Sequence, residues 1–202
     1  MKRTVDDFWQ WFNENSEQLM DIDSLSDEKS ENLLQKFDNV LKTYSEGIDF
    51  ELGDLTTNGR SLLFTANGNE EYFDDVFNLC DSAPILDFWE IIALRQAQGE
   101  HASISYGKYH YKSKNLLFVP LENENNNEEV GLKVAITNYN ENDDDQLIAV
   151  YSLIEIMIGE EICATMVKYL ELCDKSSSEF DSENFLPLTD LPAFIEWKMC
   201  KQ

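Results

Sequence analysis

The feature that most constrains the fold is an order of predicted elements that occurs twice along the chain. In residues 48–95, a segment that alternates apolar and polar residues and a second apolar segment are followed by an amphipathic helical pattern and then by a third apolar segment. Residues 115–172 repeat this order of strand, strand, helix and strand. Because each unit buries one face of its strands under its helix, two units can share one sheet. The sequence therefore predicts an internal duplication within a mainly antiparallel sheet whose two helices lie on one face. A parallel strand–helix–strand crossover would contradict it.

Turn and capping residues set the boundaries within the two units. Asn58-Gly59 is a hairpin signal, and Asn69 is an N-cap for the first helix. Asn142 or Asp143 begins the second helix, which runs to about Ile158. The predicted strands are residues 48–52, 61–66, 89–94, 115–121, 132–138 and 164–172. The segments before the two helices are also alike, since one reads TANGNE and the other TNYNE.

The two ends of the chain are predicted to be helical. Two amphipathic helices form a hairpin over residues 1–46. Residues 175–202 form a mobile loop rich in Ser and acidic residues, and then a short helix that docks Phe194 and Trp197. The predicted N-caps are Thr4 and Ser26 in the hairpin and Thr189 in the terminal helix. We therefore expect one α+β domain over residues 1–202.

The charge of the chain limits its partners. Its 15 Lys and Arg residues are opposed by 40 Asp and Glu residues, which gives a net charge of −25. Such a surface repels nucleic-acid phosphates and anionic membranes, and it speeds encounter with cationic proteins. We therefore expect neither nucleic acid nor membrane as a partner, and a cationic protein as the favoured one.

The cytoplasm is the expected location. The basic residues Lys2 and Arg3 are soon followed by Asp6 and Asp7 instead of the apolar stretch of a signal peptide, so no signal peptide is expected. The longest apolar run, Leu147–Ile158, is too short to span a bilayer. No Cys-x-x-Cys pair occurs among the four cysteines, which fits free thiols in a reducing compartment.

No catalytic residue, cofactor or metal site is predicted, so an enzyme is the less favoured class. The segment Asn140–Asp145 is rich in oxygen ligands, but a calcium loop starting there would need Gly at its sixth position and Glu at its twelfth. Those positions hold Asp145 and Tyr151. The two histidines, His101 and His110, lack the spacing of a metal pair, and His110 fits a strand position.

Two groups of acidic residues are the candidate partner-binding site. Each group lies at the start of the helix in one predicted unit, so a shared sheet could bring them side by side. The first group is Glu70, Glu71, Asp74 and Asp75, and the second is Glu141, Asp143, Asp144 and Asp145. Together they would complement a Lys- and Arg-rich surface. The alternative is that each acid only interacts favourably with its helix dipole and keeps the chain soluble.

Three segments resemble a family of acidic bacterial α+β proteins built on a domain of unknown function. They are the aromatic first helix with Phe8-Trp9-x-Trp11-Phe12, the segment Ile48–Gly53, and the ending Leu188–Trp197. The segment Ala83-Pro84 to Trp89-Glu90 is similar as well. These motifs are structural and imply no chemistry. In general form and acidity the chain also resembles immunity proteins that neutralise interbacterial toxins.

Two classes of function remain open. The favoured class is an acidic protein-binding module, such as an immunity protein or inhibitor of a cationic partner. The alternative is an enzyme or a small-molecule-binding protein whose pocket the sequence does not reveal. A deep pocket with titratable groups would favour the second class.

Overall fold

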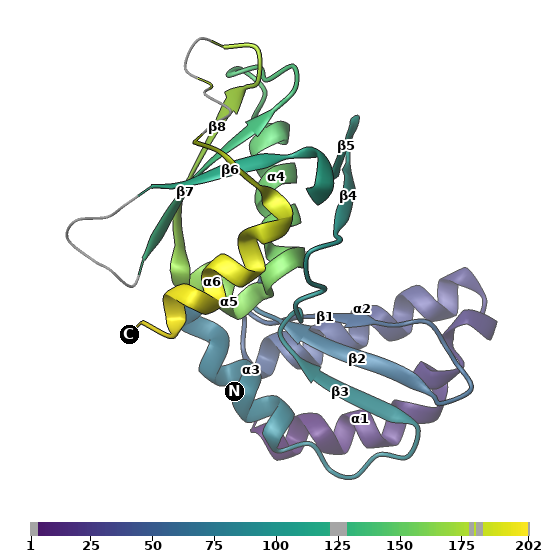
Figure 1. The fold of residues 1–202 in the computed structure, drawn as a ribbon. Coiled ribbons are helices and arrows are strands. Elements are labelled where there is room, and N and C mark those ends of the chain that lie inside the picture. Colours follow the sequence, from purple (N-terminus) through teal and green to yellow (C-terminus); the bar gives the residue numbers. More distant parts are fainter. Residues whose placement is uncertain (1–3, 122–128, 178–179, 181–183, 202) are drawn as a thin grey trace. The chain divides into compact units, whose positions relative to one another are not determined.

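The computed structural model describes residues 4–121, 129–177, 180 and 184–201 (Figure 1). It divides the chain into two compact units, Met1–Arg95 and Gln96–Gln202, which are treated separately below. Helices and mixed sheets occur in both, so the protein has the predicted α+β fold. No helix within the described ranges combines the length and apolar character needed to cross a lipid bilayer.

The first unit begins with the predicted helical hairpin. Helix α1 (Val5–Met20) is followed by a short 3-10 turn and by helix α2 (Asp27–Tyr44). Thr4 caps α1 as predicted, because its side chain accepts a hydrogen bond from the backbone N–H of Asp7 while the Asp7 carboxylate accepts one from the N–H of Thr4. Ser26 occupies the N-cap position of α2, but its side chain makes no capping hydrogen bond.

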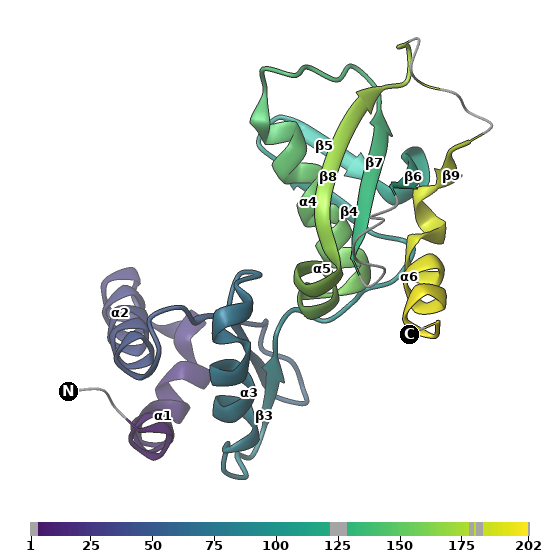
Figure 2. The same cartoon turned by 90° about the vertical axis from the view of Figure 1, so that its left-hand side faces the viewer.

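Three strands complete the first unit. Strand β1 (Asp49–Leu52) pairs antiparallel with β2 (Arg60–Thr65), and β2 pairs parallel with β3 (Trp89–Ala93). Helix α3 (Phe73–Asp81) connects β2 to β3. Figure 2 shows that α1, α2 and α3 all lie on one side of this sheet.

Aromatic side chains form the core between that sheet and the helices. Phe8, Phe12, Phe37 and Phe64 are fully buried. The ring centroids of Phe8 lie 5.7 Å from Phe64 and 5.8 Å from Phe37. Each buried Phe contributes about 1.5–3 kcal/mol through burial, and well-oriented ring pairs add about 0.5–1.5 kcal/mol. The aromatic stripe of the first helix therefore serves the core of this unit.

The second unit contains a hairpin and a four-stranded sheet. In the hairpin, β4 (Ser103–Tyr106) pairs antiparallel with β5 (Tyr109–Lys112). The sheet has the order β8-β7-β6-β9, with β7 antiparallel to β6 and parallel to β8. Its strands are β6 (Leu117–Leu121), β7 (Val130–Ile136), β8 (Val167–Asp174) and β9 (Leu186–Pro187).

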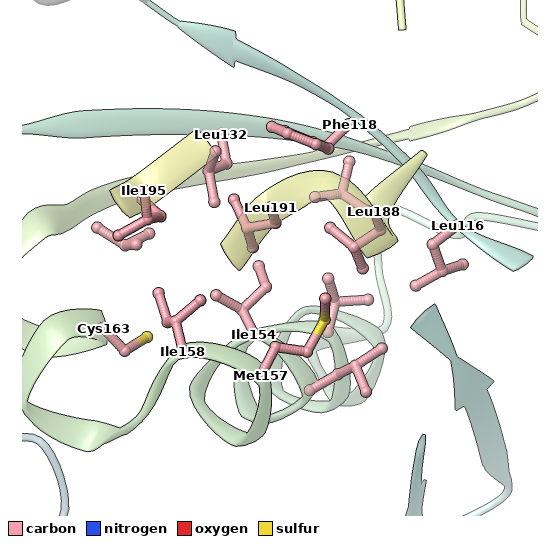
Figure 3. Packing of buried hydrophobic residues seen from close by; sticks show 14 of the residues in the cluster. Leu116, Phe118, Leu132, Ile154, Met157, Ile158, Cys163, Leu188, Leu191 and Ile195 are labelled. Carbon is pink, nitrogen blue, oxygen red and sulfur yellow. The ribbon is translucent and has the colours of Figure 1, made fainter. Parts of the chain in front are cut away.

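Three helices belong to the second unit. Helices α4 (Asp144–Ile158) and α5 (Glu160–Met166) connect β7 to β8, and α6 (Leu191–Met199) ends the chain. Figure 3 shows how the inner face of α4 packs toward the sheet and the C-terminal segment. The core residues labelled there include Ile154, Met157 and Ile158 of α4, Phe118 and Leu132 of the sheet, and Leu188, Leu191 and Ile195 of the C-terminal segment.

The duplicated order of elements is confirmed, but the shared antiparallel sheet is wrong. The strands form separate sheets, one in each unit, and in both the strand after the helix is parallel to the strand before it. The helix returns the chain along the covered face to the end where the preceding strand began, so the next strand must run in the same direction. What the units share is an antiparallel pair followed by a parallel crossover. The grouping of the chain as one domain stays a prediction.

Element boundaries differ most at the ends of the second unit. Residues 164–166 are helical rather than part of the closing strand. Helix α6 is preceded by a 3-10 turn, Leu188–Asp190, so Asp190 rather than Thr189 occupies its N-cap. Phe194 packs on Phe118, with ring centroids 5.9 Å apart, but Trp197 is 52% exposed and does not dock. The predicted mobile loop at 175–183 lies partly outside the described residues.

Candidate functional site

Each acidic group follows a turn that begins with a left-handed asparagine. Asn67 (φ 51°) and Asn138 (φ 58°) both lie two residues beyond the last residue of their strand, β2 and β7. Asparagine tolerates this backbone region better than most residues. Two residues further on, the side chain of Asn69 accepts a hydrogen bond from the N–H of Glu71, and the side chain of Asn140 accepts one from the N–H of Asn142, at 3.2 Å in both cases. The two units thus present their acidic groups through similar turns.

The acidic group of the first unit lies at the start of α3. Asn69 caps as predicted, but it caps a 3-10 turn, Glu70–Tyr72, rather than a continuous helix. Asp74 is exposed in the first turn of α3, whereas Asp75 is half-buried. The remaining members, Glu70 and Glu71, are exposed.

Carboxylates of this group raise the pKa of the neighbouring Tyr72. Glu46 raises the pKa of Tyr72 most strongly, and Glu71 and Asp75 raise it further, because a phenolate would be repelled by their charges. In the part of the chain that the structure describes, Glu71, Asp74 and Asp75 form no ion pair with Lys, Arg or His. Among the described residues, Glu71, Asp74 and Asp75 therefore present negative charge that no ion pair offsets.

The acidic group of the second unit is divided between one engaged carboxylate and three exposed ones. Asp143 accepts hydrogen bonds from the hydroxyl of Tyr109 and from Lys108, whose Nζ lies 2.9 Å from Oδ2. The hydrogen bond from Tyr109, followed by that from Lys108, lowers the pKa of Asp143, and the hydrogen bond to Asp143 raises the pKa of Lys108. Asp143 thereby ties the β4–β5 hairpin to the start of α4. The exposed members are Glu141, Asp144 and Asp145.

A buried glutamine fixes the turn between β7 and α4. Gln146 is 1% exposed, and its Oε1 accepts a 2.7 Å hydrogen bond from the N–H of Asn140. Its Nε2 donates to the hydroxyl of Tyr111 and to the carbonyl oxygen of Asn138, at 3.1 Å each. The side-chain amide thus satisfies backbone groups that would otherwise be buried without partners. This network links the two ends of the segment Asn140–Gln146, which includes the candidate calcium loop Asn140–Asp145.

The histidines take part in separate contacts. His101 lies 3.2 Å from the carboxylate of Glu100, and Nδ1 of His110, on strand β5 as predicted, lies 2.8 Å from Oγ of Ser105. Within the residues that the structure describes, no group of three His, Cys, Asp or Glu side chains is placed to hold a metal ion. Cys163 is buried beside Tyr151, and burial raises the pKa of its thiol to about 12, so it is a poor nucleophile.

Sequence reasoning missed the apolar residues beside the second acidic group. Leu147 and Ile148 are 40% and 43% exposed on α4. They lie three and four positions after Asp144, so the three side chains share one face of the helix. The apolar run Leu147–Ile158 could have revealed them. A helix with one buried face needs only a stripe of apolar residues, and this run places apolar residues around the whole helix, so some of them must be exposed.

No protein-family model, curated protein or solved structure matches this chain. The family resemblance inferred from the sequence therefore stays a prediction. The two acidic groups belong to different units, and their combination into one face also stays a prediction.

Proposed function

We propose that this protein is an acidic protein-binding module that recognises a cationic partner, in the manner of an immunity protein or inhibitor. The proposal rests on one observation in the second unit. In the part of the chain that the structure describes, exposed carboxylates without an ion pair and exposed apolar side chains lie close together in sequence at the start of α4 and just before it. This surface, defined as Glu141, Asp144, Asp145, Leu147 and Ile148, is called the α4 surface below.

The chemistry of the α4 surface fits a protein interface. Leu147 and Ile148 supply apolar area whose burial favours association, at about 25 cal/mol per Å² removed from water. The carboxylates lie just before these two residues in the chain, and charges of one sign select partners of the opposite charge. Among the described residues, Glu141, Asp144 and Asp145 have no ion pair that a partner would have to displace.

The net charge of −25 supports the same class of partner. A field of that sign raises the encounter rate with a cationic protein and lowers it for acidic proteins, nucleic acids and anionic lipids. Asp143 contributes little to this surface, because Lys108 and Tyr109 already engage its carboxylate.

The test begins with the full chain immobilised as bait for an extract of the source organism. A captured cationic protein would be identified by mass spectrometry, purified and titrated against the wild type by surface plasmon resonance. The double variant Leu147→Ser/Ile148→Ser and the double variant Asp144→Lys/Asp145→Lys should each weaken its binding at least about tenfold, which corresponds to about 1.4 kcal/mol.

The matched control carries the same charge change elsewhere in the unit. Glu161→Lys/Glu196→Lys alters two exposed carboxylates outside the α4 surface. It should weaken binding by less than about threefold, as expected for a screened long-range effect. If the control and the Asp144/Asp145 variant weaken binding equally, net charge alone is responsible and no specific surface exists.

The alternative of a small-molecule-binding protein has one observation in its favour. A hollow of about 550 Å³ in the first unit is lined by apolar residues, by Ser30, by the carboxylates of Asp23 and Asp27, and by Arg60, whose side chain is 3% exposed. The guanidinium pairs with Asp23, but among the described residues its Nε donates to no acceptor. A buried donor without a partner is costly, and a ligand carboxylate would satisfy it. A panel of small carboxylic acids that raises the Tm of the wild type, but not of Arg60→Lys, would favour this alternative.

A further inference from the structure

The segment before β3 exposes two large apolar side chains in the first unit. Ile85 is 99% exposed and Phe88 is 70% exposed. The backbone of Phe88 is left-handed, with φ 65°. Bulky residues rarely adopt this conformation, because Cβ then crowds the following carbonyl group. An exposed aromatic residue held in a strained conformation calls for a physical reason.

Several contacts fix this segment at the end of the first sheet. The N–H of Arg60 donates a 2.9 Å hydrogen bond to the carbonyl oxygen of Phe88, and the N–H of Trp89 donates a 3.3 Å hydrogen bond to that of Leu86. Gly59 has φ 113°, and a Cβ on it would lie 1.9 Å from the same Phe88 oxygen. Figure 1 shows the β1–β2 connection and the start of β3 at one end of the sheet. The backbone of Phe88 is therefore fixed by the fold, and its side chain is exposed from that fixed position.

Acid-lined hollows adjoin Phe88. One hollow of about 350 Å³ lies toward the β1–β2 connection, and another of about 480 Å³ lies toward the end of α1. Phe88 lines both of them, and the cationic residue that lines the first, Arg60, is already paired with Asp23. The carboxylates that line them are Asp54 and Glu90 in the first hollow and Glu17, Asp21 and Asp87 in the second.

We propose that Ile85 and Phe88 form an apolar anchor for a basic segment of a partner protein. Apolar residues of that segment pack on the two exposed side chains, and Lys or Arg residues on either side of them enter the two acid-lined hollows. The charge pattern selects this occupant. A second copy of the chain would bring carboxylates against carboxylates, and an anionic membrane would be repelled in the same way. The anchor lies in the first unit, whereas the α4 surface lies in the second.

Two short peptides of equal charge test the anchor with the full chain. The first carries Leu-Trp-Leu between two Arg-Arg pairs, and the second carries Gly-Ser-Gly in the same place. Fluorescence anisotropy with labelled peptides should show the first binding at least about tenfold more tightly, because only its apolar residues can cover Ile85 and Phe88. In Ile85→Ser/Phe88→Ser the preference should fall below about twofold, while the affinity for the second peptide stays unchanged.

Matched variants separate this proposal from its alternatives. Trp197→Ser/Met199→Ser removes two other exposed apolar residues and should keep the full peptide preference. Asp144→Lys/Asp145→Lys should keep it as well, so failure of the α4 surface and failure of the anchor are distinguishable. Ile85→Ser alone cannot disturb the core, since Ile85 is 99% exposed, and it should already reduce the preference.

The anchor is overturned if both peptides bind the wild type equally, or if the preference survives in Ile85→Ser/Phe88→Ser. It is also overturned if sedimentation shows a wild-type dimer that this variant abolishes, because the occupant is then a second copy. Binding to phosphatidylcholine vesicles that the variant loses would assign the anchor to a membrane instead. In each of those outcomes a basic protein segment is not the occupant.

Discussion

Asn67 and Asn138 occupy corresponding places in the two units, each in the left-handed backbone region two residues after the strand, β2 or β7, that precedes the helix of the parallel crossover. In both cases the chain turns there from an antiparallel strand pair toward the helix of a parallel crossover. The parallel crossovers contradict the duplication as it was predicted, within one mainly antiparallel sheet. What the two units share is the order of their elements, the directions of strand pairing and this turn.

The left-handed turn predicts how substitutions at Asn138 behave. Asn138→Gly should change the free energy of unfolding little, because glycine adopts φ 58° without strain. Asn138→Ala should lower it by about 1–2 kcal/mol. Urea unfolding followed by far-ultraviolet circular dichroism measures both. Equal stability of the two variants would show that the backbone conformation at Asn138 is not strained for a Cβ-bearing residue.

The close approach of Gly59 to Phe88 predicts a large loss of stability in Gly59→Ala. Gly99→Ala is the matched control, because Gly99 also has a positive φ, 83°, but a Cβ there would meet nothing within 4 Å. The control should cost about 1–2 kcal/mol for the backbone strain alone. Gly59→Ala should cost clearly more, since its Cβ would overlap the Phe88 carbonyl oxygen and break the hydrogen bond from Arg60. A similar cost for both variants would contradict the close contact.

The carboxylate of Asp143 predicts a change of stability at acidic pH. Its pKa is lowered in the folded state by Tyr109 and Lys108, relative to about 3.9 in an unfolded chain. The ionised form therefore stabilises the folded protein above the unfolded pKa, and this contribution is lost as the pH falls through the folded pKa. The stability difference between the wild type and Asp143→Asn should be constant near neutral pH and shrink below about pH 4.

The turn at residues 138–146 predicts no response to calcium. Gln146 already engages the N–H of Asn140 and the carbonyl of Asn138, and Lys108 already pairs with Asp143. Differential scanning fluorimetry should therefore give the same Tm in EDTA and in millimolar calcium. A rise of several degrees with calcium would reveal a cation site that forms only when the cation binds.

Local patterns predicted most elements, whereas pairings between distant segments could not be predicted. Periodicity and capping specify a helix over a few turns, which is why the hairpin and the cap at Thr4 are confirmed. The parallel pairing of β2 with β3 depends on how a helix packs on the sheet, and no residue within either strand encodes it. The contact between Lys108 and Asp143 joins positions 35 apart, so the sequence did not reveal that this candidate carboxylate is engaged. Ile and Phe are residue types that are usually buried, and only the structure shows that Ile85 and Phe88 are exposed.

The α4 surface predicts that its charged and apolar residues affect different steps of binding. Asp144 and Asp145 are exposed, so they act on the approach of a cationic partner through a field that salt screens over roughly 8 Å at physiological ionic strength. Asp144→Lys/Asp145→Lys should therefore lower the association rate and flatten its dependence on salt. Leu147→Ser/Ile148→Ser should leave the association rate within about threefold and raise the dissociation rate at least about tenfold, because apolar contacts form only in the docked complex.

Surface plasmon resonance at low and high salt separates the two rates, and circular dichroism confirms that each variant is folded. If both variants change only the dissociation rate, the carboxylates contact the partner directly and do not steer it. If neither variant changes either rate, the partner binds elsewhere. The anchor at Ile85 and Phe88 is then the surface to test against that same partner, since its residues lie in the other unit and are intact in both variants.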